Sequence, residues 1–571
     1  MSASPIRSRP SPVPAPRRPS PVPTAAPSPA PSPAAQPGAP ISPPPDPHGD
    51  LRGTAIRSAL WVALGKWGNQ LATLVVFTLL GRLLAPSELG LAALATVFVT
   101  LFQVLSDQGF STALIQKKHV DDADRNTAFW ISVGSALVLM ALVAALAPLA
   151  SSAFDQPQLG AVLVGMSPMV LFTALAGTPQ ALLERDFQFR SLTMRTLYGS
   201  VIGGVAGVVV AFLGGGVWSI VVQSVVTSFV AVVFLWTVTK WRPGLRVSRR
   251  SARELRDTGV SVLGIQLIGL ANAQGDKLIV GAALGPVPLG YYFVGTRIVT
   301  MLTDVQTSVI DAVSLTTLSK LQSTRERLRD AFYGLTSMGA ATAIATFAII
   351  AATADVSLPF VFGPQWEPAA PVMQILCLMG CLNAVIVFDR NALIAVGAAR
   401  AALVITIVQC VIGLGAVAAA VPFGVIVVSF AVVLRQYAAW PLRLRTLRRH
   451  VGISIRTYLG HWSGPMLAGV VTFGVCWGVG RSWDPGRSVA AVVLFLAVEA
   501  VLGLGVYVAS LRVTGPPAYR ELRGLYRALR SRVAPRRHTY NAYVSRHAHS
   551  GADQPPAAAP MVEPDGVTPI R

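Results

Sequence analysis

Residues 81–90 read GRLLAPSELG, and residues 281–290 read GAALGPVPLG. Five of the ten positions are identical, and the two stretches are offset by 200 residues. The pairs Thr96/Thr296 and Thr100/Thr300 keep the same offset. Proline and glycine also recur in turns without any common origin, but a fixed register favours an internal repeat. The sequence therefore predicts two copies of one structural unit.

The sequence around these stretches is too apolar for a water-soluble domain. Of the 571 residues, 53% are hydrophobic and 13% are charged. A soluble fold of this length could not bury so much apolar surface and keep a wettable exterior. The net charge of +21 lies in short basic clusters between apolar runs. We interpret it as contact with anionic lipid headgroups and expect no nucleic-acid partner.

Apolar runs of about 20 residues, the length that crosses a bilayer as a helix, occur fourteen times. They lie at roughly 59–80, 89–106, 127–150, 160–183, 194–213, 217–238, 259–283, 288–312, 331–352, 369–388, 400–419, 422–440, 463–480 and 488–511. We predict an all-α polytopic membrane protein with two six-helix lobes and two further C-terminal helices. Each quoted stretch joins the first two helices of a lobe, and both lobes begin on the same side. The repeat is therefore expected to be parallel.

The expected domains follow from these spans and from the two tails. They are a disordered Pro-rich cytoplasmic tail (1–55), the N-lobe (56–257), the C-lobe (258–450), two extra helices (451–512), and a basic amphipathic helix with a disordered cytoplasmic tail (513–571). The Pro-rich tail has too few apolar residues to order itself, and it is either inert or a ligand for a proline-binding partner. The basic helix, near 517–533, is suited to lying on anionic lipid.

Basic residues mark one side of the membrane. Alternate connections carry clusters such as KWRPGLRVSRRSARELR (240–256) and RLRTLRRH (443–450). The connections on the other side hold Lys or Arg only at Arg82, Arg481 and Arg487. Because Lys and Arg concentrate in cytoplasmic loops, we predict a multi-pass protein of the cytoplasmic (plasma) membrane with both termini in the cytoplasm.

The four cysteines all lie inside apolar segments. Cys377 and Cys381 are spaced to share a helix face, which would suit a metal, but no histidine lies near them in the sequence. We interpret Cys377, Cys381, Cys410 and Cys476 as small buried hydrophobic residues. The sequence predicts no metal site, no catalytic residue, and no cofactor apart from a coupling H⁺ or Na⁺.

Polar residues inside the apolar spans are candidates for a functional site. A charge at mid-membrane costs about 2.5–3.5 kcal/mol on insertion scales, so such groups usually face a cavity or a partner. In the first lobe they are Lys66, Asn69, Gln70, Gln103 and Asp107. In the second lobe they are Asn272, Gln274, Asp276, Lys277, Arg297, Asp304 and Asp311. They gather on the first two helices of each lobe, which we expect to line a cleft used for alternating access.

Five stretches of the sequence, in the order expected of the family, resemble the polysaccharide (lipid-linked oligosaccharide) flippases of the MOP superfamily. They are GRLLAPSELGLAALA (81–95), DQGFSTALIQKKHVDDADRNTAFW (107–130), LLERDFQFR (182–190), GDKLIVGAALGPVPLGYYFVGTRI (275–298) and FGPQWEPAAPVMQIL (362–376). The similarity is to the Wzx-like exporters of exopolysaccharide or O-antigen repeat units. It covers about residues 55–512, and both tails depart from it.

The resemblance implies a function in polysaccharide biosynthesis. The family flips undecaprenyl-diphosphate-linked oligosaccharide from the inner to the outer leaflet of the cytoplasmic membrane. The expected partners are therefore a polyprenyl-diphosphate-linked glycan, anionic lipids at the C-terminal basic helix, and polysaccharide-synthesis enzymes.

We hypothesise that Lys66, Lys277 and Arg297 hold the diphosphate, because cations offset the desolvation of an anion and Arg can bind phosphate through two hydrogen bonds. Lys66 could instead snorkel to the cytoplasmic end of its helix, and Arg297 could pair with a neighbouring helix. The residues Asn69, Gln70, Gln103, Asp107 and Asn272 are expected to line the cavity.

A second hypothesis assigns ion coupling to Asp276, Asp304 or Asp311. Burial favours the protonated form of a carboxylate, so one of them could take up a proton, or bind Na⁺, during the return step. A hydrogen bond between helices is the alternative role for each.

Other functions stay open at this point. A peptidoglycan lipid-precursor flippase carries the same polyprenyl diphosphate, and a MATE-like exporter has a related architecture. A membrane enzyme of glycan assembly, a polymerase or ligase, would need acid–base groups in a sizeable outer loop. The longest outer connection, 354–369, has two acids and no Lys, Arg or His. A scaffold that gathers polysaccharide enzymes through its tails could coexist with transport.

Overall fold

The structure is a computed structural model that describes residues 65, 67–117, 119–320, 325–483, 486, 488–515, 518–520 and 523. Within these ranges, the side chains of 255, 257, 258, 308–320 and 325 are left out of the description. The predicted N-terminal tail, Lys66 and most of the predicted basic C-terminal helix therefore lie outside the described residues.

The described residues form helices joined by short connections and contain no strand. Residues 67–83 are helical. They are followed by α2 (Pro86–Asp107), α3 (Phe110–Gln116), α4 (Asp122–Ala153), α5 (Pro157–Met166), α6 (Pro168–Arg185), α7 (Phe189–Phe212), α8 (Trp218–Val238), α9 (Arg249–Leu284), α10 (Pro286–Lys320), α11 (Arg325–Phe362), the 3-10 turn η1 (Pro364–Ala369), α12 (Ala370–Ala395), α13 (Ala399–Ala420), η2 (Val421–Phe423), α14 (Val425–His450), α15 (Ile455–Ser482) and α16 (Val489–Thr514).

Eleven of the helical segments in this part of the chain are long and apolar enough to cross a membrane. The predicted all-α, multi-pass membrane fold is therefore confirmed. α9 and α10 are not among the eleven, although they have 36 and 35 residues. The total of fourteen spans and the domain boundaries stay predictions. The predicted span 160–183 consists of two helices, because Pro168 starts α6 and cannot donate a hydrogen bond to α5.

The two repeated stretches form helix starts. α2 begins at Pro86 and α10 at Pro286, where proline fits because an N–H in the first turn has no partner within the helix. The Glu88 carboxylate accepts a hydrogen bond of 2.8 Å from the Ala85 N–H. Gly285, just before α10, has a φ of +83°, which favours glycine.

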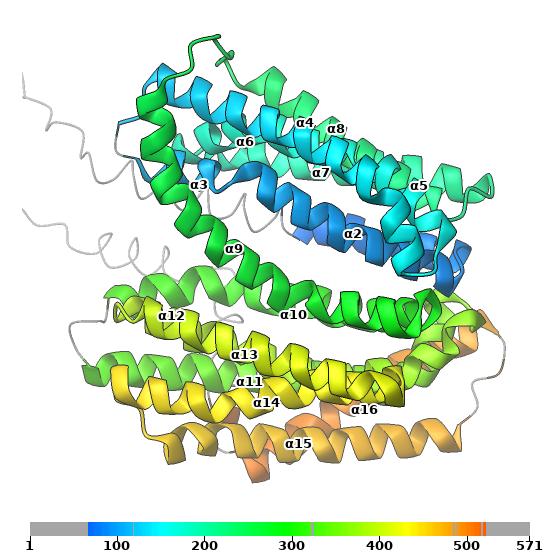
Figure 1. Cartoon of the computed structure of the whole chain (residues 1–571). Helices are drawn as coiled ribbons and strands as arrows, with labels where there is room; N and C mark the ends of the chain where they lie inside the picture. The colour runs from blue at the N-terminus through cyan, green and yellow to red at the C-terminus, as the bar shows by residue number, and fades with distance from the viewer. Residues whose placement is uncertain are drawn as a thin grey trace, which may run out of the picture. The chain divides into compact units, whose positions relative to one another are not determined.

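The helices form two lobes (Figure 1). Helices α2–α8 pack on one another in the N-lobe, and α10–α14 pack on one another in the C-lobe. α15 and α16 pack against α11, where Gly469 lies against Ile344 and Gly503 against Ile349. Glycine at these positions lets the helix axes approach closely, as is common in membrane proteins.

The lobes meet where α2 and α10 begin, at what we call the proline end. A β-carbon on Gly90 would lie 1.8 Å from the carbonyl oxygen of Pro286. A β-carbon on Gly290 would lie 2.0 Å from the carbonyl oxygen of Pro86. The contact joins matching positions of the repeat in both directions, as a two-fold arrangement requires, and neither position has room for a side chain.

Residues of η1 and the end of α11 also hold the proline end together. The indole Nε1 of the fully buried Trp366 donates a 2.7 Å hydrogen bond to the Gly81 carbonyl. Phe362 packs against Gly81, and Arg82 donates to the carbonyl of Phe360 (3.3 Å). The N-lobe and the C-lobe are thus in direct contact over both copies of the repeated stretch.

α9 contacts both lobes. Its first half packs on the turn between α2 and α3, where Gln108 and Gly109 have φ values of 49° and 72°. Gly259 lies against the carbonyl oxygen of Gln108. The second half of α9 packs on α13, where Gly275 faces Leu414. This helix therefore links the N-lobe to the C-lobe mechanically.

An ion-pair cluster also holds the start of α9 on the N-lobe, ahead of the predicted span 259–283. Lys117 Nζ lies 2.8 Å from the Asp124 carboxylate and 2.9 Å from the Glu254 carboxylate. The hydrogen bond to Asp124 raises the pKa of the Lys117 ammonium. The hydrogen bond from Lys117 lowers the pKa of the Glu254 carboxyl. Arg250 pairs with Glu254 as well (2.9 Å).

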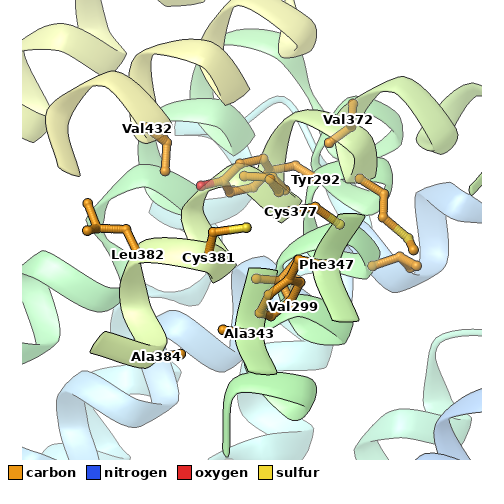
Figure 2. Close-up of a cluster of buried hydrophobic side chains, with 14 of the residues drawn as sticks. Tyr292, Val299, Ala343, Phe347, Val372, Cys377, Cys381, Leu382, Ala384 and Val432 are labelled. Carbon is orange, nitrogen blue, oxygen red and sulfur yellow. The ribbon is translucent and has the colours of Figure 1, made fainter. Parts of the chain in front are cut away.

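Buried side chains of α10, α11, α12 and α14 form the C-lobe core (Figure 2). Phe347 fits against Gly380, where a β-carbon would lie 2.4 Å from its ring. Cys377 and Cys381 lie in the same core. All four cysteines are buried and unpaired, as interpreted from the sequence.

Candidate substrate-binding cavity

A cavity of about 930 Å³ lies between the lobes. Its N-lobe wall comes from the helix at 67–83 and from α2, α6, α7 and α8. Its C-lobe wall comes from α9, α10, α12, α13 and α14. The expectation that the first two helices of each lobe line a cleft therefore covers only part of the cavity wall.

The C-lobe wall is cationic. Its basic residues are Lys277, Arg297, Arg390, Arg435 and Arg443, and its one acid is Asp276. In a space shielded from bulk water, such an excess of one charge attracts ligands of the opposite charge. This wall is therefore suited to an anion.

Arg435 on α14 is the most strongly confined of these cations. It is 7% exposed, and its buried Nε and Nη1 have no hydrogen-bond partner. Its Nη2 donates to the carbonyl of Asn272 (3.4 Å). Gly413 makes room for the side chain, because a β-carbon there would lie 2.4 Å from Arg435 Cδ. A buried guanidinium with unsatisfied donors is unfavourable unless an anionic ligand accepts from it.

The acid on this wall is engaged by the protein itself. The Tyr292 hydroxyl donates a hydrogen bond to the Asp276 carboxylate, and both residues are buried. Lys277 Nζ instead donates to Gln274 Oε1 (2.6 Å) and lies 5.6 Å from the ring centroid of Phe293. The Lys277 ammonium thus remains on the cavity wall as a positive charge.

A chain of amides runs along the same wall from Arg443. The Arg443 Nη2 donates to Gln409 Oε1 (3.3 Å), and the Gln409 amide donates to Gln436. Gln436 Nε2 donates to Asn383 Oδ1 (2.5 Å). Every member lines the cavity. The chain fixes the Arg443 side chain through Nη2 and leaves its buried Nη1 without a partner.

A buried carboxylate of α12 is bonded to α15. Asp389 is fully buried, and the Tyr458 hydroxyl of α15 donates to its two oxygens at 3.1 and 3.3 Å. Asp389 itself is not among the cavity-lining residues.

The N-lobe wall is polar but uncharged along the described residues. Its polar groups on α7 and α8 are Ser200, Gln223, Ser224, Thr227 and Ser228. The hydroxyls of Thr227 and Ser228 donate to the carbonyls of Gln223 (2.7 Å) and Ser224 (2.9 Å). Both residues line the cavity, and a hydroxyl that donates one hydrogen bond can still accept another.

Glycines on α7 bring this wall together. A β-carbon on Gly203 would lie 2.0 Å from Thr227 Oγ1, and one on Gly207 would lie 2.7 Å from Gln223 Cβ. The close approach of α7 and α8 presents the hydroxyl and amide groups as one surface.

Five of the candidate residues line the cavity: Asn272, Gln274, Asp276, Lys277 and Arg297. The Asn272 Oδ1 is buried without a hydrogen-bond partner. Lys66 lies outside the described residues. These placements leave the predicted roles untested.

Of the other candidates whose side chains the structure describes, none is among the residues that line the cavity. Asn69 accepts from the Ser200 hydroxyl (2.6 Å), and Gln70 donates to the Met301 carbonyl (3.3 Å).

Two further predicted residues bond within the N-lobe. Gln103 donates to Thr173 (3.0 Å), and Asp107 accepts from Ser111. Asp304 is an exposed residue of α10. The side chain of Asp311 lies outside the described part.

Sequence reasoning missed Arg390, Arg435 and Arg443. Arg435 lies inside the predicted span 422–440, so the rule applied to Lys277 would have found it. Arg443 was assigned to the basic cluster 443–450, and Arg390 follows the predicted end of span 369–388. Only packing shows that these two face the cavity.

Comparisons with known proteins show similarity to proteins of polysaccharide biosynthesis. A family model described as "Polysaccharide biosynthesis protein" matches residues 79–371. The lipopolysaccharide biosynthesis protein WzxC of Escherichia coli (strain K12) is 25% identical over 340 residues, which are 59% of this chain and 68% of WzxC. The succinoglycan biosynthesis transport protein ExoT of Rhizobium meliloti (strain 1021) is 24% identical over 57% of this chain and 66% of ExoT.

A solved structure shares the fold. The structure described as lipid II flippase MurJ in an inward closed conformation aligns with a TM-score of 0.66. It covers 81% of this chain and 99% of the MurJ chain at 12% sequence identity. At that identity the likeness concerns the fold alone.

Proposed function

Because the chain belongs to the polysaccharide biosynthesis protein family, we propose that it moves a polyprenyl-diphosphate-linked oligosaccharide from the inner to the outer leaflet of the cytoplasmic membrane. The polyprenyl chain would stay in the lipid while the polar headgroup crosses through the cavity between the lobes. The oligosaccharide would then serve polysaccharide biosynthesis outside the cell.

The observation that carries this proposal is the cationic C-lobe wall. Five basic side chains and one acid line it, and the acid is already bonded to Tyr292. A diphosphate is multiply charged and cannot cross hydrocarbon unaided, whereas guanidinium groups hold it with charge-assisted hydrogen bonds. The uncharged hydroxyls and amides opposite suit sugar hydroxyl groups.

The reciprocal contact of Gly90 and Gly290 supports an alternating-access mechanism. This contact holds the lobes together at the proline end, and the distribution of basic residues orients that end away from the cytoplasm. We propose that the present arrangement accepts the headgroup from the cytoplasmic leaflet. Separation of the lobes at the proline end would release it outside.

The charge of the cavity also ranks the alternatives. An exporter of organic cations would need an acidic or aromatic cavity, so the cationic wall disfavours a MATE-like function. A peptidoglycan precursor carries the same diphosphate, and the cavity suits it equally well. Transport is favoured over a polymerase or ligase because the similar protein ExoT is described as a transport protein.

Ion coupling remains a proposal, and Asp276 is the carboxylate best placed for it. It lines the cavity beside Lys277, whereas Asp304 does not, and the Asp311 side chain is outside the described part. A coupling ion that neutralises the Asp276 charge would leave the wall more positive and strengthen its hold on an anion. Transport that does not respond to pH, Na⁺ or membrane potential would refute coupling.

The direct test is lipid flipping by the purified protein in vesicles. A fluorescent undecaprenyl-diphosphate-linked oligosaccharide is placed in one leaflet, and its arrival in the other leaflet is followed by quenching. We expect faster crossing with the protein than with empty vesicles, and a peptidoglycan-precursor lipid added as competitor measures selectivity. Crossing no faster than in empty vesicles would refute the proposal.

A further inference from the structure

The cavity cations lie at two depths, measured along the helices from the proline end. Lys277 lies about two turns from the end of α9, or roughly 10 Å. Arg297 and Arg435 each lie about three turns from the starts of α10 and α14, or roughly 16 Å. We call Lys277, Arg297 and Arg435 the deep tier.

The other two cations lie much farther from the proline end. Arg443 lies about five turns from the start of α14, or roughly 27 Å. Arg390 lies more than five turns from the start of α12, or roughly 30 Å. We call Arg390 and Arg443 the mouth tier. Arg435 and Arg443, on the same helix, are separated by roughly 12 Å along its axis.

The two tiers are farther apart along the helices than a diphosphate is long. The two phosphorus atoms of a diphosphate share a bridging oxygen, so the group is shorter than two turns of helix, or about 11 Å. The cavity therefore offers two positions for the same anionic group.

The mouth tier has the features of a built site. Arg443 is 9% exposed, its Nη2 is fixed by Gln409, and its buried Nη1 has no partner. Arg390 lines the same space with an exposed side chain. An anion there would accept from Arg443 Nη1 and lie near the Arg390 charge.

The amide chain connects the mouth tier to the deep tier. It runs from Arg443 through Gln409 and Gln436 to Asn383, and Gln436 is the next residue after Arg435. These amides offer an anion neutral hydrogen-bond partners between the two groups of cations. An anion that moves from the mouth tier to the deep tier could therefore exchange its water for amide hydrogen bonds and would not be left without partners between the tiers.

We propose that Arg390 and Arg443 form a receiving site that takes up the phosphate groups of a polyprenyl diphosphate before they reach Lys277, Arg297 and Arg435. This inference rests on the proposed function and adds a second binding position to it. The receiving site governs capture from the membrane, and the deep tier governs the crossing itself.

The test separates capture from crossing in reconstituted vesicles. The probe is undecaprenyl diphosphate carrying one uncharged N-acetylglucosamine, so that no acidic sugar can occupy the mouth tier. Initial flipping rates are measured against the density of the probe in the membrane. For Arg443→Gln and for Arg390→Gln we expect about a tenfold higher half-saturating density with little change in maximal rate, the effect of losing one charge-assisted hydrogen bond.

Deep-tier variants should behave differently. Lys277→Gln and Arg435→Gln are expected to lower the maximal rate instead. Arg445→Gln serves as the matched control, because Arg445 is an exposed residue of α14 outside the cavity lining. Arg390→Gln keeps the test valid if the buried Arg443 variant does not fold, since Arg390 is exposed.

Three outcomes would overturn the inference. One is a fall in maximal rate alone in the mouth-tier variants. Another is a mouth-tier defect that appears only with an acidic glycan, which would assign the site to a sugar carboxylate. The third is a mouth-tier variant that matches Arg445→Gln. If the wild-type protein flips neither this probe nor the oligosaccharide-linked lipid, the proposed function is refuted rather than the receiving site.

Discussion

The two walls of the cavity differ in the kind of chemistry that they offer. The C-lobe wall presents charged groups, and two of them, Arg435 and Arg443, are buried with unsatisfied donors. The N-lobe wall presents the Gln223 amide and hydroxyls that already bond within their own helix or to a neighbour. Charge-assisted hydrogen bonds are about twice as strong as neutral ones. We propose accordingly that the constant part of the ligand binds the C-lobe wall and the variable part the N-lobe wall.

This division fits a carrier whose cargo has one constant and one changing portion. A polyprenyl diphosphate is the same whatever glycan it bears, so it can be bound by strong and specific groups. Sugar residues differ between glycans, and weak hydroxyl contacts tolerate that variation. If the two walls have these roles, substitutions on the C-lobe wall should reduce flipping more than those on the N-lobe wall. The two sets of reductions should also depend differently on the glycan.

The largest effect is expected at Arg435. Arg435→Gln should reduce flipping about a hundredfold, since it removes a buried charge and at least two hydrogen bonds to phosphate. The loss should be the same for every glycan tested. Flipping rates with two different lipid-linked glycans in vesicles measure it, and a strong preference for one glycan would contradict the assigned role of the C-lobe wall.

A large effect is also expected at the proline end. Gly90→Leu places a side chain where the Pro286 carbonyl lies, so the lobes could not close there and flipping should fall about tenfold or more. Gly134→Leu is the matched control, because nothing lies within 4 Å of a β-carbon at Gly134.

Whether the proline end is open or closed can be measured directly in the same variants. A cysteine at the cavity residue Ala93 should react with a membrane-impermeant thiol reagent from outside the cell faster with Gly90→Leu than with Gly134→Leu. Equal labelling would show that the Gly90 contact does not close this end.

A smaller effect is expected on the N-lobe wall. Gln223→Ala should reduce flipping only a few-fold, because one neutral hydrogen bond contributes about 1 kcal/mol. The effect should disappear with undecaprenyl diphosphate that bears no sugar. An equal loss with and without sugar would remove Gln223 from glycan binding and erase the contrast between the walls.

The smallest effect concerns the attachment of α9 to the N-lobe and depends on pH. Lys117 lowers the pKa of Glu254 from its ordinary value of 4.5, so the ionised carboxylate stabilises the fold above that pH. Glu254→Gln should therefore lower the Tm slightly at pH 7. The difference from the wild type should vanish as the pH falls through the folded pKa.

Thermal unfolding in detergent between pH 3 and pH 7 measures this difference. Glu367→Gln, at an exposed residue of η1, is the control for the loss of one carboxylate. A Tm difference that grows at low pH would contradict the ion-pair assignment.

The fold could be predicted in large part from the sequence. Length and apolarity predict the all-α membrane fold, which the structure confirms, and the resemblance to the polysaccharide flippases is confirmed by the family match. The 81–90 and 281–290 repeat pointed to the two places where the lobes meet at Gly90 and Gly290. The helix break before Pro168 was missed, because apolar content alone does not distinguish one long helix from two.

The site was less predictable because it depends on side-chain direction. Lys277, Arg297, Asp276 and Asn272 were singled out as intramembrane polar residues and do line the cavity. Asn69, Gln103 and Asp107 belong to the same class but bond within the lobe. Periodicity within one helix cannot tell which of its faces meets a cavity once several helices pack around it. Arg443 shows the converse, since a residue of a basic cluster at a helix end faces inward.

The arginine in the middle of α14 has a consequence for how the protein is made. A helix that carries Arg435 and Gln436 at its centre enters a bilayer less readily than the apolar helices before it, by an amount comparable to the insertion cost of one charge. α12 and α13 supply Asn383, Gln409 and the space at Gly413 that accommodate those two side chains. Both helices are synthesised before α14. Membrane integration of α14 should therefore depend on the presence of α12 and α13 at the translocon. Truncations or swaps that remove α12 or α13 would then be lost during biogenesis, before any transport could be tested.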